Sequence, residues 1–300
     1  MKTLICYFSG TGNTKKVVDK YAQQFEENGW EVDLQNIEKE MTFDCSDYDS
    51  IGIAYPVHAF NAPSIVVDFC KKLPKLQEKK QLYIIKTSGE PLKINNISST
   101  KIKKILKRKN YILSNEYHYV MPYNMIFRHS NAMAYKMWNT AERLIPIDCK
   151  EIIDKKETKL SYFPLSTPIS WVMRIEHWGG RFNGKKYKVN EKCVHCQKCV
   201  RDCPTHNITI DEEGNFHFGN NCLMCMRCSF MCPVDAFKIG WFNGWKVNGK
   251  YVFDDPDNTE QKSHKNFCKH SYKKYFKKSE EKISKNAEKS NTENKKDVKI

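Results

Sequence analysis

Eight cysteines between positions 193 and 232 constrain this chain more than any other feature of its sequence. They form two runs of identical spacing, Cys193–Pro204 and Cys222–Pro233, and each run reads C-x2-C-x2-C-x3-C-P. Every cysteine and the final proline recur 29 positions later (222 − 193 = 29), so the runs are two copies of one binding unit. Thiolates are soft ligands, and the x2 spacing lets one tight loop aim three sulfurs at three corners of a cubane. The pattern predicts two iron–sulfur sites.

Disulfides and zinc are the competing explanations for these cysteines. Disulfides persist in oxidising compartments, which fits poorly with a chain that otherwise has the character of a cytoplasmic protein. Structural zinc sites use four ligands in C-x2-C pairs and need neither a third x2-spaced cysteine nor a trailing proline. Iron–sulfur ligation therefore explains the pattern best.

Each run resembles the cluster-binding run of bacterial two-cluster ferredoxins, in which the fourth cysteine ligates the other cluster. The distance along the chain agrees, since the fourth cysteine lies too far along to close the same cube comfortably. The resemblance implies that one [4Fe–4S] cluster is held by Cys193, Cys196, Cys199 and Cys232. It implies that the second is held by Cys203, Cys222, Cys225 and Cys228.

The beginning of the chain carries a second binding motif. Residues 2–8 form a continuous apolar run that is typical of a parallel strand buried on both faces, and Val17, Val18 and Phe25 recur at helical spacing further on. A glycine- and hydroxyl-rich loop between them, at the start of a helix, predicts a phosphate site. It lacks the lysine of a Walker A loop and the third glycine of a dinucleotide fingerprint. The candidate ligands are Ser9, Gly10, Thr11, Gly12, Asn13 and Thr14.

This FSGTGNT segment resembles the FMN-phosphate loop of flavodoxins in residues and position. The remainder of this half of the chain alternates between strands and helices, which favours a parallel sheet. The further predicted strands are 31–37, 50–54, 81–86 and about 112–120, and the predicted helices are 64–73, 97–109 and 131–160, the last with a break or kink at Pro146. The predicted fold class is α/β: a flavodoxin-like five-stranded parallel sheet with helices on both faces, plus a small α+β bacterial two-cluster ferredoxin domain.

Two later loops should flank the flavin ring, because ligands of such sheets bind beyond the carboxyl ends of the strands. Aromatic rings stack well on a flat flavin, so we expect Tyr55 or Phe60 to do so. The candidates are Tyr55, Pro56, Val57, His58, Ala59, Phe60 and Asn61 in one loop, and Thr87, Ser88, Gly89 and Glu90 in the other. The sequence offers no convincing catalytic residues elsewhere.

Changes in composition divide the chain into four parts. They are a flavodoxin-like domain at 1–160, a connector at 161–189, a ferredoxin domain at 190–242 and a basic extension at 243–300 that we expect to be partly disordered, above all in its last twenty residues. Two prolines and a Gly–Gly pair should break any long element in the connector. Trp171 and Trp178 should pack at the interface between the domains.

The net charge and the targeting signals of the sequence limit the classes of partner and the location that we expect. The net charge is +15, which favours a solvated lysine-rich surface or an acidic partner. We expect redox partner proteins and no nucleic acid, and contact of the basic tail with a membrane surface or an acidic partner stays open. The opening segment is too short for a signal peptide, and the sequence has no apolar window long enough for a membrane span. A cytoplasmic location is therefore expected.

The combination of motifs resembles bacterial flavodoxin–ferredoxin fusion proteins over about residues 1–240. That resemblance implies FMN, two [4Fe–4S] clusters and intracellular electron transfer in anaerobic metabolism. An electron carrier between proteins is favoured over an enzyme. The alternatives are an FMN/iron–sulfur oxidoreductase that reduces a quinone, a nitro compound or free flavin, and, more weakly, a redox sensor. The sequence has no G-x-G-x-x-G segment, which disfavours a self-contained NAD(P)H dehydrogenase.

Overall fold

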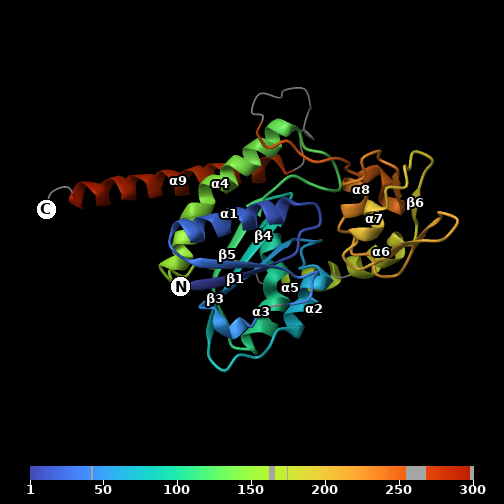
Figure 1. Cartoon of the computed structure of the whole chain (residues 1–300). Helices are drawn as coiled ribbons and strands as arrows, with labels where there is room; N and C mark the ends of the chain where they lie inside the picture. Colours follow the sequence, from blue (N-terminus) through green and yellow to red (C-terminus); the bar gives the residue numbers. More distant parts are fainter. Residues whose placement is uncertain (42, 162–165, 174, 255–267, 298–300) are drawn as a thin grey trace.

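A five-stranded parallel sheet forms the larger half of the computed structural model, which describes all residues except 42, 162–165, 174, 255–267 and 298–300 (Figure 1). The strands are β1 (Lys2–Tyr7), β2 (Glu31–Asn36), β3 (Ser50–Pro56), β4 (Lys80–Ser88) and β5 (Tyr111–Val120). Their order is β2-β1-β3-β4-β5, and every neighbouring pair is parallel. The predicted flavodoxin-like sheet is confirmed. The order reverses at β1 and β3, which is the switch point where such sheets bind ligands.

Helices cover both faces of the sheet. One face is covered by α1 (Asn13–Glu27) and α4 (Asn131–Ile153), and the other by α2 (Ser64–Lys72) and α3 (Thr100–Lys107). The short 3₁₀ helices η1 (Cys45–Asp47) and η2 (Lys93–Ser99) precede β3 and α3. Pro146 lies inside α4 without ending it, so of the predicted alternatives, a break or a kink, the structure excludes the break. Packing of the flanking buried residues, such as Leu144 and Ile152, against α1 and the sheet offsets the lost hydrogen bond.

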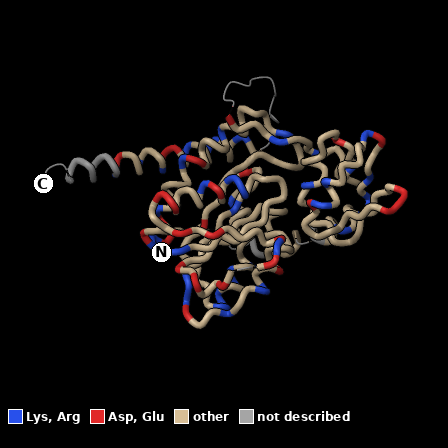
Figure 2. Tube along the Cα trace, viewed as in Figure 1, with Lys and Arg blue, Asp and Glu red and all other residues tan. Residues whose placement is uncertain are grey.

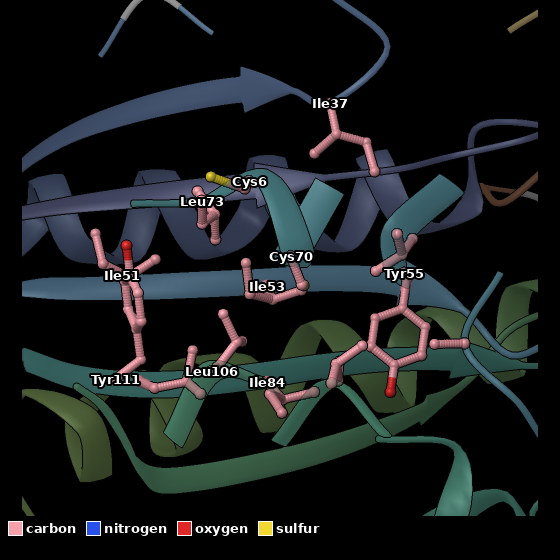
Figure 3. Close-up of a cluster of buried hydrophobic side chains, with 14 of the residues drawn as sticks. Cys6, Ile37, Ile51, Ile53, Tyr55, Cys70, Leu73, Ile84, Leu106 and Tyr111 are labelled. Carbon is pink, nitrogen blue, oxygen red and sulfur yellow. The ribbon is translucent and has the colours of Figure 1, made fainter. Parts of the chain in front are cut away.

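The core on the α2 and α3 side is dense and apolar (Figure 3). Ile51, Ile53 and Ile84 from the central strands meet Cys70 of α2 and Leu106 of α3 there. All five are at most 1% exposed, and burying one such side chain contributes about 1.5–3 kcal/mol. The two central strands are therefore held firmly, and so are the loops that leave their carboxyl ends.

The cysteine runs lie in a smaller domain beside the carboxyl-terminal edge of the sheet (Figure 1). Its strand β6 (Tyr187–Val189) pairs antiparallel with β9 (Phe237–Ile239), and β7 (Ile208–Ile210) pairs antiparallel with β8 (Phe216–Phe218) to form a hairpin. Two one-turn helices, α7 (Lys198–Arg201) and α8 (Arg227–Phe230), follow the cysteine loops, and η3 (Gly240–Trp245) follows β9.

Backbone conformations in this domain recur at the same spacing as the two cysteine runs. Non-glycine residues with positive φ occur in pairs 29 positions apart: His195 and Met224, Gln197 and Met226, and His206 and Asp235. Such conformations are uncommon outside glycine. Their recurrence at the same offset means that both runs fold into the same loop.

The connector corrects two expectations. It forms α5 (Ser166–Met173) and α6 (Ile175–Gly184), and the Gly179–Gly180 pair lies inside α6 instead of ending it. A Cβ at Gly180 would come within 3.1 Å of the Met224 side chain, so the missing side chain allows close approach to the cluster domain. Trp171 and Trp178 do not pack at an interface. They are 71% and 65% exposed.

The basic tail also differs from expectation. Lys269–Asp297, which include most of the last twenty residues expected to be disordered, form a long helix, α9, that lies along α4 and extends beyond the body (Figure 1). Most of its residues are good helix formers, and its first turns pack on Val120 and Met137. Residues 255–267 and 298–300 of the predicted extension lie outside the described residues. Within the described part of the chain, no helix is long and apolar enough to span a bilayer.

Candidate functional site

The phosphate-loop candidate joins the end of β1 to the start of α1. The Ser9 hydroxyl oxygen accepts hydrogen bonds from the backbone N–H groups of Gly12 and Lys15, each at 3.2 Å. Gly12 has φ 105°, a conformation that glycine adopts without strain and that allows the sharp turn into the helix. Backbone amides and the positive end of α1 therefore face one concave loop, which suits a phosphate.

The second and third loops are tied to the first. Backbone N–H of Val57 donates to the Thr87 carbonyl at 2.8 Å, which couples the loops after β3 and β4. The buried hydroxyls of Thr14 and Thr87 are 2.8 Å apart and couple the loops after β1 and β4. Ala59 and Phe60 both have positive φ, so the chain folds back sharply there. The three loops form one connected wall.

These loops surround a cavity of about 570 Å³ at the carboxyl ends of the strands. Of the predicted flavin ligands, those that line it are Ser9, Gly10, Thr11, Asn13, Thr14, Pro56, Val57, His58, Ala59, Phe60, Thr87, Ser88, Gly89 and Glu90. The other three, Gly12, Tyr55 and Asn61, are not among the lining residues. The loops are thus brought together as expected.

Tyr55 is the main correction in this set. Its ring lies in the core on the α2 and α3 side (Figure 3), and its hydroxyl is 3.3 Å from that of Ser98. Side chains alternate between the two faces of a strand, and position 55 of β3 faces the helices instead of the cavity. Phe60 is the aromatic residue of the predicted loops that borders the cavity.

Sequence reasoning missed about half of the cavity wall. The additional lining residues are Leu92, Met121, Pro122, Tyr123, Asn124, Met125, Ile126, Met173, Ile175, Gly179, Gly180, Met224, Phe242 and Trp245. Among them, residues 121–126 follow β5, and Leu92 lies between the third loop and η2. The other residues come from the connector and the cluster domain. Nothing local in the sequence shows that these parts fold over the cavity.

Glu90 is the titratable group of the third loop that lines the cavity. Its carboxylate accepts hydrogen bonds from the Tyr123 hydroxyl and from Asn95 Nδ2, the latter at 3.1 Å. Burial raises the pKa of Glu90 above its ordinary value, while these two hydrogen bonds act in the opposite direction. Behind the loop, burial lowers the pKa of His118 to about 3, and its neutral ring contacts the Ser88 hydroxyl at 2.7 Å.

The eight cysteines of the two runs gather around two small cavities in the cluster domain. One cavity is lined by Cys193, Cys196, Cys199 and Cys232, with Cys228 also at its border. The other is lined by Cys203, Cys222, Cys225 and Cys228. Each cavity thus receives three cysteines of one run and the fourth cysteine of the other, which is the arrangement expected for crossed ligation.

Backbone N–H groups point at the sulfurs in both cavities. The donors His195 N and Met224 N lie 3.4 Å from Cys193 Sγ and Cys222 Sγ, and Asn207 N lies 3.3 Å from Cys203 Sγ. Ala236 N also donates to Cys232 Sγ, at 3.3 Å. Such N–H···S bonds help to set the reduction potential of a cluster.

The cofactors implied by the two domains fit these residues. No three His, Cys, Asp or Glu side chains within the described ranges are grouped closely enough for a single metal ion, and the thiols instead surround two cavities. The large cavity has hydroxyls and amides at one end and apolar walls elsewhere, as an FMN phosphate and ring require. When bound, the clusters exchange single electrons and FMN exchanges one or two.

The two domains meet where the second cluster cavity approaches the phosphate loop. A Cβ at Gly10 would come within 2.6 Å of the Cys225 carbonyl oxygen, so only glycine allows this approach. The Arg227 guanidinium donates to the carbonyl oxygens of Ser9 and Gly10 at 2.8 and 2.9 Å, and to Glu38 at 2.6 Å. The cavity of Cys203, Cys222, Cys225 and Cys228 therefore lies against the flavin loop.

Two domain families match this chain. Residues 4–118 match a flavodoxin domain, and residues 192–238 match a 4Fe-4S dicluster domain. Among curated proteins, the Pyruvate synthase subunit PorD of Methanocaldococcus jannaschii is 46% identical over 48 residues, which are 16% of this chain. The chain spans 56% of the length of that relative.

Similar solved structures include a flavodoxin of Streptococcus pneumoniae TIGR4, at 14% identity and a TM-score of 0.39 over 52% of this chain and 99% of that one. The oxidised Flavodoxin 1 of Bacillus cereus is 14% identical, with a TM-score of 0.40 over 51% of this chain and 98% of that one. The family matches imply FMN in the first domain and iron–sulfur clusters in the second. The chain thus joins a flavodoxin domain to a 4Fe-4S dicluster domain, and both domains support a role in electron transfer.

Proposed function

We propose that this chain carries low-potential electrons between FMN and redox partner proteins through two clusters in a fixed order. The near cluster is held by Cys203, Cys222, Cys225 and Cys228, and the far cluster by Cys193, Cys196, Cys199 and Cys232. The contact between Gly10 and Cys225 carries this proposal, because it puts one cluster cavity directly against the flavin loop.

The residues of the junction have separate tasks in this mechanism. Arg227 joins the loop of the near cluster to the carbonyl oxygens of the phosphate loop, and its ion pair with Glu38 is largely buried. Met224 lies beside Cys225 and lines the flavin cavity. Apolar residues of the connector and of η3, such as Ile175 and Phe242, close the far side of the cavity and reduce the access of water.

Exposure supports the far cluster as the contact point for partners. Cys196 is exposed, and Val194 beside it is 60% exposed, whereas Cys225 of the near cluster is buried. A partner protein can reach the far cluster without moving the domains. The likeness to a subunit named for pyruvate synthase supports, as partner, an oxidoreductase that exchanges electrons with iron–sulfur proteins. The thiol-rich composition supports a reducing cytoplasm as its location.

Anaerobic purification followed by redox titration tests this proposal. We expect one FMN, eight iron and eight sulfide per chain, because two [4Fe–4S] cubanes contain that number of atoms. The reduced protein should exchange electrons slowly with quinones, nitro compounds and free flavin when no partner protein is present. Iron and sulfide without any capacity to bind FMN would refute the flavin site. Fast multiple turnover of a small acceptor would favour a flavin-dependent reductase over the carrier.

A further inference from the structure

The tail helix α9 reaches the flavin cavity from the outside of the fold. Tyr272, in its first turns, is 6% exposed, and its hydroxyl donates a hydrogen bond to the Gly89 carbonyl oxygen. Gly89 lies in the third flavin loop and lines the cavity. A segment far away along the chain therefore contacts the backbone of the flavin loop directly.

A stack of rings connects the same two segments a second time. The Tyr123 ring lies so close to Gly89 that a Cβ there would overlap it. Tyr123 stacks on His129, with ring centroids 5.3 Å apart and an interplanar angle of 12°. His129 Nε2 in turn lies 3.3 Å from the Tyr272 hydroxyl. Gly89, Tyr123, His129 and Tyr272 form a closed ring of contacts.

The direction of these hydrogen bonds depends on the protonation state of His129. Burial lowers its pKa to about 4, so the ring is neutral at pH 7. Its Nδ1 accepts from the Tyr123 backbone N–H at 3.2 Å, so the single ring proton is on Nε2. Nε2–H can therefore donate to the Tyr272 oxygen, which leaves the phenol proton for the Gly89 carbonyl. The two hydrogen bonds therefore run in one direction, from His129 through the Tyr272 hydroxyl to the Gly89 carbonyl of the flavin loop.

The position of Tyr272 is set by contacts remote from the cavity. Tyr275 also lies on α9, and its hydroxyl accepts from Val120 N–H at 3.4 Å. Further along, Glu280 forms a two-point ion pair with Arg143 at 2.6 and 3.0 Å, and Lys282 pairs with Asp148 at 2.5 Å. α9 is thereby fixed on α4 at several points, and it brings Tyr272 to the loop as a rigid element.

We propose that α9 completes the flavin site and that Tyr272 is a positioning residue, which holds the Gly89 carbonyl and thereby tunes the affinity and potential of bound FMN. This rests on the flavin site proposed above. In the third loop, the Gly89 carbonyl accepts from Tyr272, and the Glu90 carboxylate accepts from Tyr123. Because a flavin potential responds to hydrogen bonds and charge at the ring edge, the orientation of the Gly89 peptide matters. The basic tail is then part of the redox site as well as part of the surface.

The test compares Tyr272→Phe with Tyr275→Phe in the full chain. Both changes remove one phenol oxygen from α9, but only the first reaches the flavin loop. We expect Tyr272→Phe to weaken FMN binding by about threefold to tenfold, the factor that one hydrogen bond contributes. It should also shift the midpoint potential of bound FMN, whereas Tyr275→Phe should leave both quantities close to those of the wild type. Flavin titration of the apoprotein and a spectroelectrochemical titration measure them.

Three outcomes separate the possibilities. If both variants bind FMN with the affinity and midpoint potential of the wild type, the role of Tyr272 is overturned while the flavin site stays intact. Equal losses in both variants would also overturn it, because the effect would then come from general loosening of α9. Failure of the wild type itself to bind FMN would refute the proposed flavin site and with it this inference.

Discussion

The two cluster sites share one sequence motif and one backbone conformation but lie in different surroundings. The near cavity lies against the flavin loop, and Cys225 in it is buried. The far cavity faces outward, and Cys196 in it is exposed. Residues at equivalent positions of the two runs show this difference in surroundings. Arg227 ties the domains together, whereas Lys198, 29 positions earlier, occupies the same place in the far loop. A repeated motif therefore specifies how each cluster is held, and docking of the domains specifies what each cluster does.

The largest expected effect comes from breaking the crossed ligation. Changing Cys203 to Ala should remove the near cluster and leave the far one, because Cys203 lies in the cavity of Cys222, Cys225 and Cys228. Iron analysis should show about half of the wild-type content, and electron exchange between FMN and the remaining cluster should fall sharply. Electron paramagnetic resonance of the reduced protein identifies the surviving cluster.

The reciprocal change, Cys232→Ala, is the matched control for that comparison. It should remove the far cluster while FMN still exchanges electrons with the near one. Loss of the Cys193 cluster alone in Cys203→Ala would contradict the crossed assignment. If Cys→Ala prevents assembly of both clusters, the Cys→Ser variants keep a weaker oxygen ligand and allow the same comparison.

Exposure predicts which cluster is damaged first. Oxidant and chelator should attack the far cluster before the near one, because Cys196 is exposed and the near site is covered by the phosphate loop. Limited exposure to air should yield a species that retains FMN and one cluster, with the far cluster lost several times faster. Spectroscopy of samples quenched over time measures both rates. Simultaneous loss of the two clusters would show that burial at the junction gives no protection.

The sequence was informative wherever function depends on local spacing. The cysteine runs and their ferredoxin resemblance predicted which cysteines gather around each small cavity, and the strand–loop–helix at Ser9–Thr14 predicted a loop that lines the large cavity. Tyr55 was misassigned because strand alternation decides which face its ring takes, and a run of apolar residues hides that alternation. Trp171 and Trp178 were misassigned because aromatic residues do not reveal whether a helix face is covered. The contact of Tyr272 with Gly89 depends on tertiary packing alone.

The distribution of charged residues is another feature that the sequence alone does not reveal. The excess of lysine was readable in the sequence, but Figure 2 shows Lys and Arg interspersed with Asp and Glu along the fold. Pairs such as Lys15–Asp19 are exposed on the surface, and exposed pairs contribute little to stability. Arg227 differs because its ion pair with Glu38 is only 17% and 13% exposed and joins two domains. Net charge did not single out this residue.

Replacing Arg227 by Ala should weaken the docking of the two domains. The change removes a largely buried ion pair and the hydrogen bonds to the phosphate loop, so we expect a loss of about 2–3 kcal/mol in the free energy of unfolding. Lys198→Ala, at the equivalent position of the repeat, should cost less than about 0.5 kcal/mol. Denaturant titration followed by flavin fluorescence compares the two. Equal losses would mean that the contacts of Arg227 with the phosphate loop do not stabilise the junction.

The smallest expected effect tests the close approach at Gly10. An alanine Cβ there would come within 2.6 Å of the Cys225 carbonyl oxygen, and because that atom belongs to the backbone, one loop must move. Overpacking of this kind costs about 1–3 kcal/mol, and we expect the lower end because the domain surfaces can separate slightly. Gly244→Ala is the control, since a Cβ there meets no atom within 4 Å. Gly10→Ala should slow electron exchange between FMN and the near cluster while the far cluster keeps its spectrum and its reactivity toward partners. Retention of the wild-type exchange rate would mean that the near cluster does not depend on this contact for its approach to the flavin.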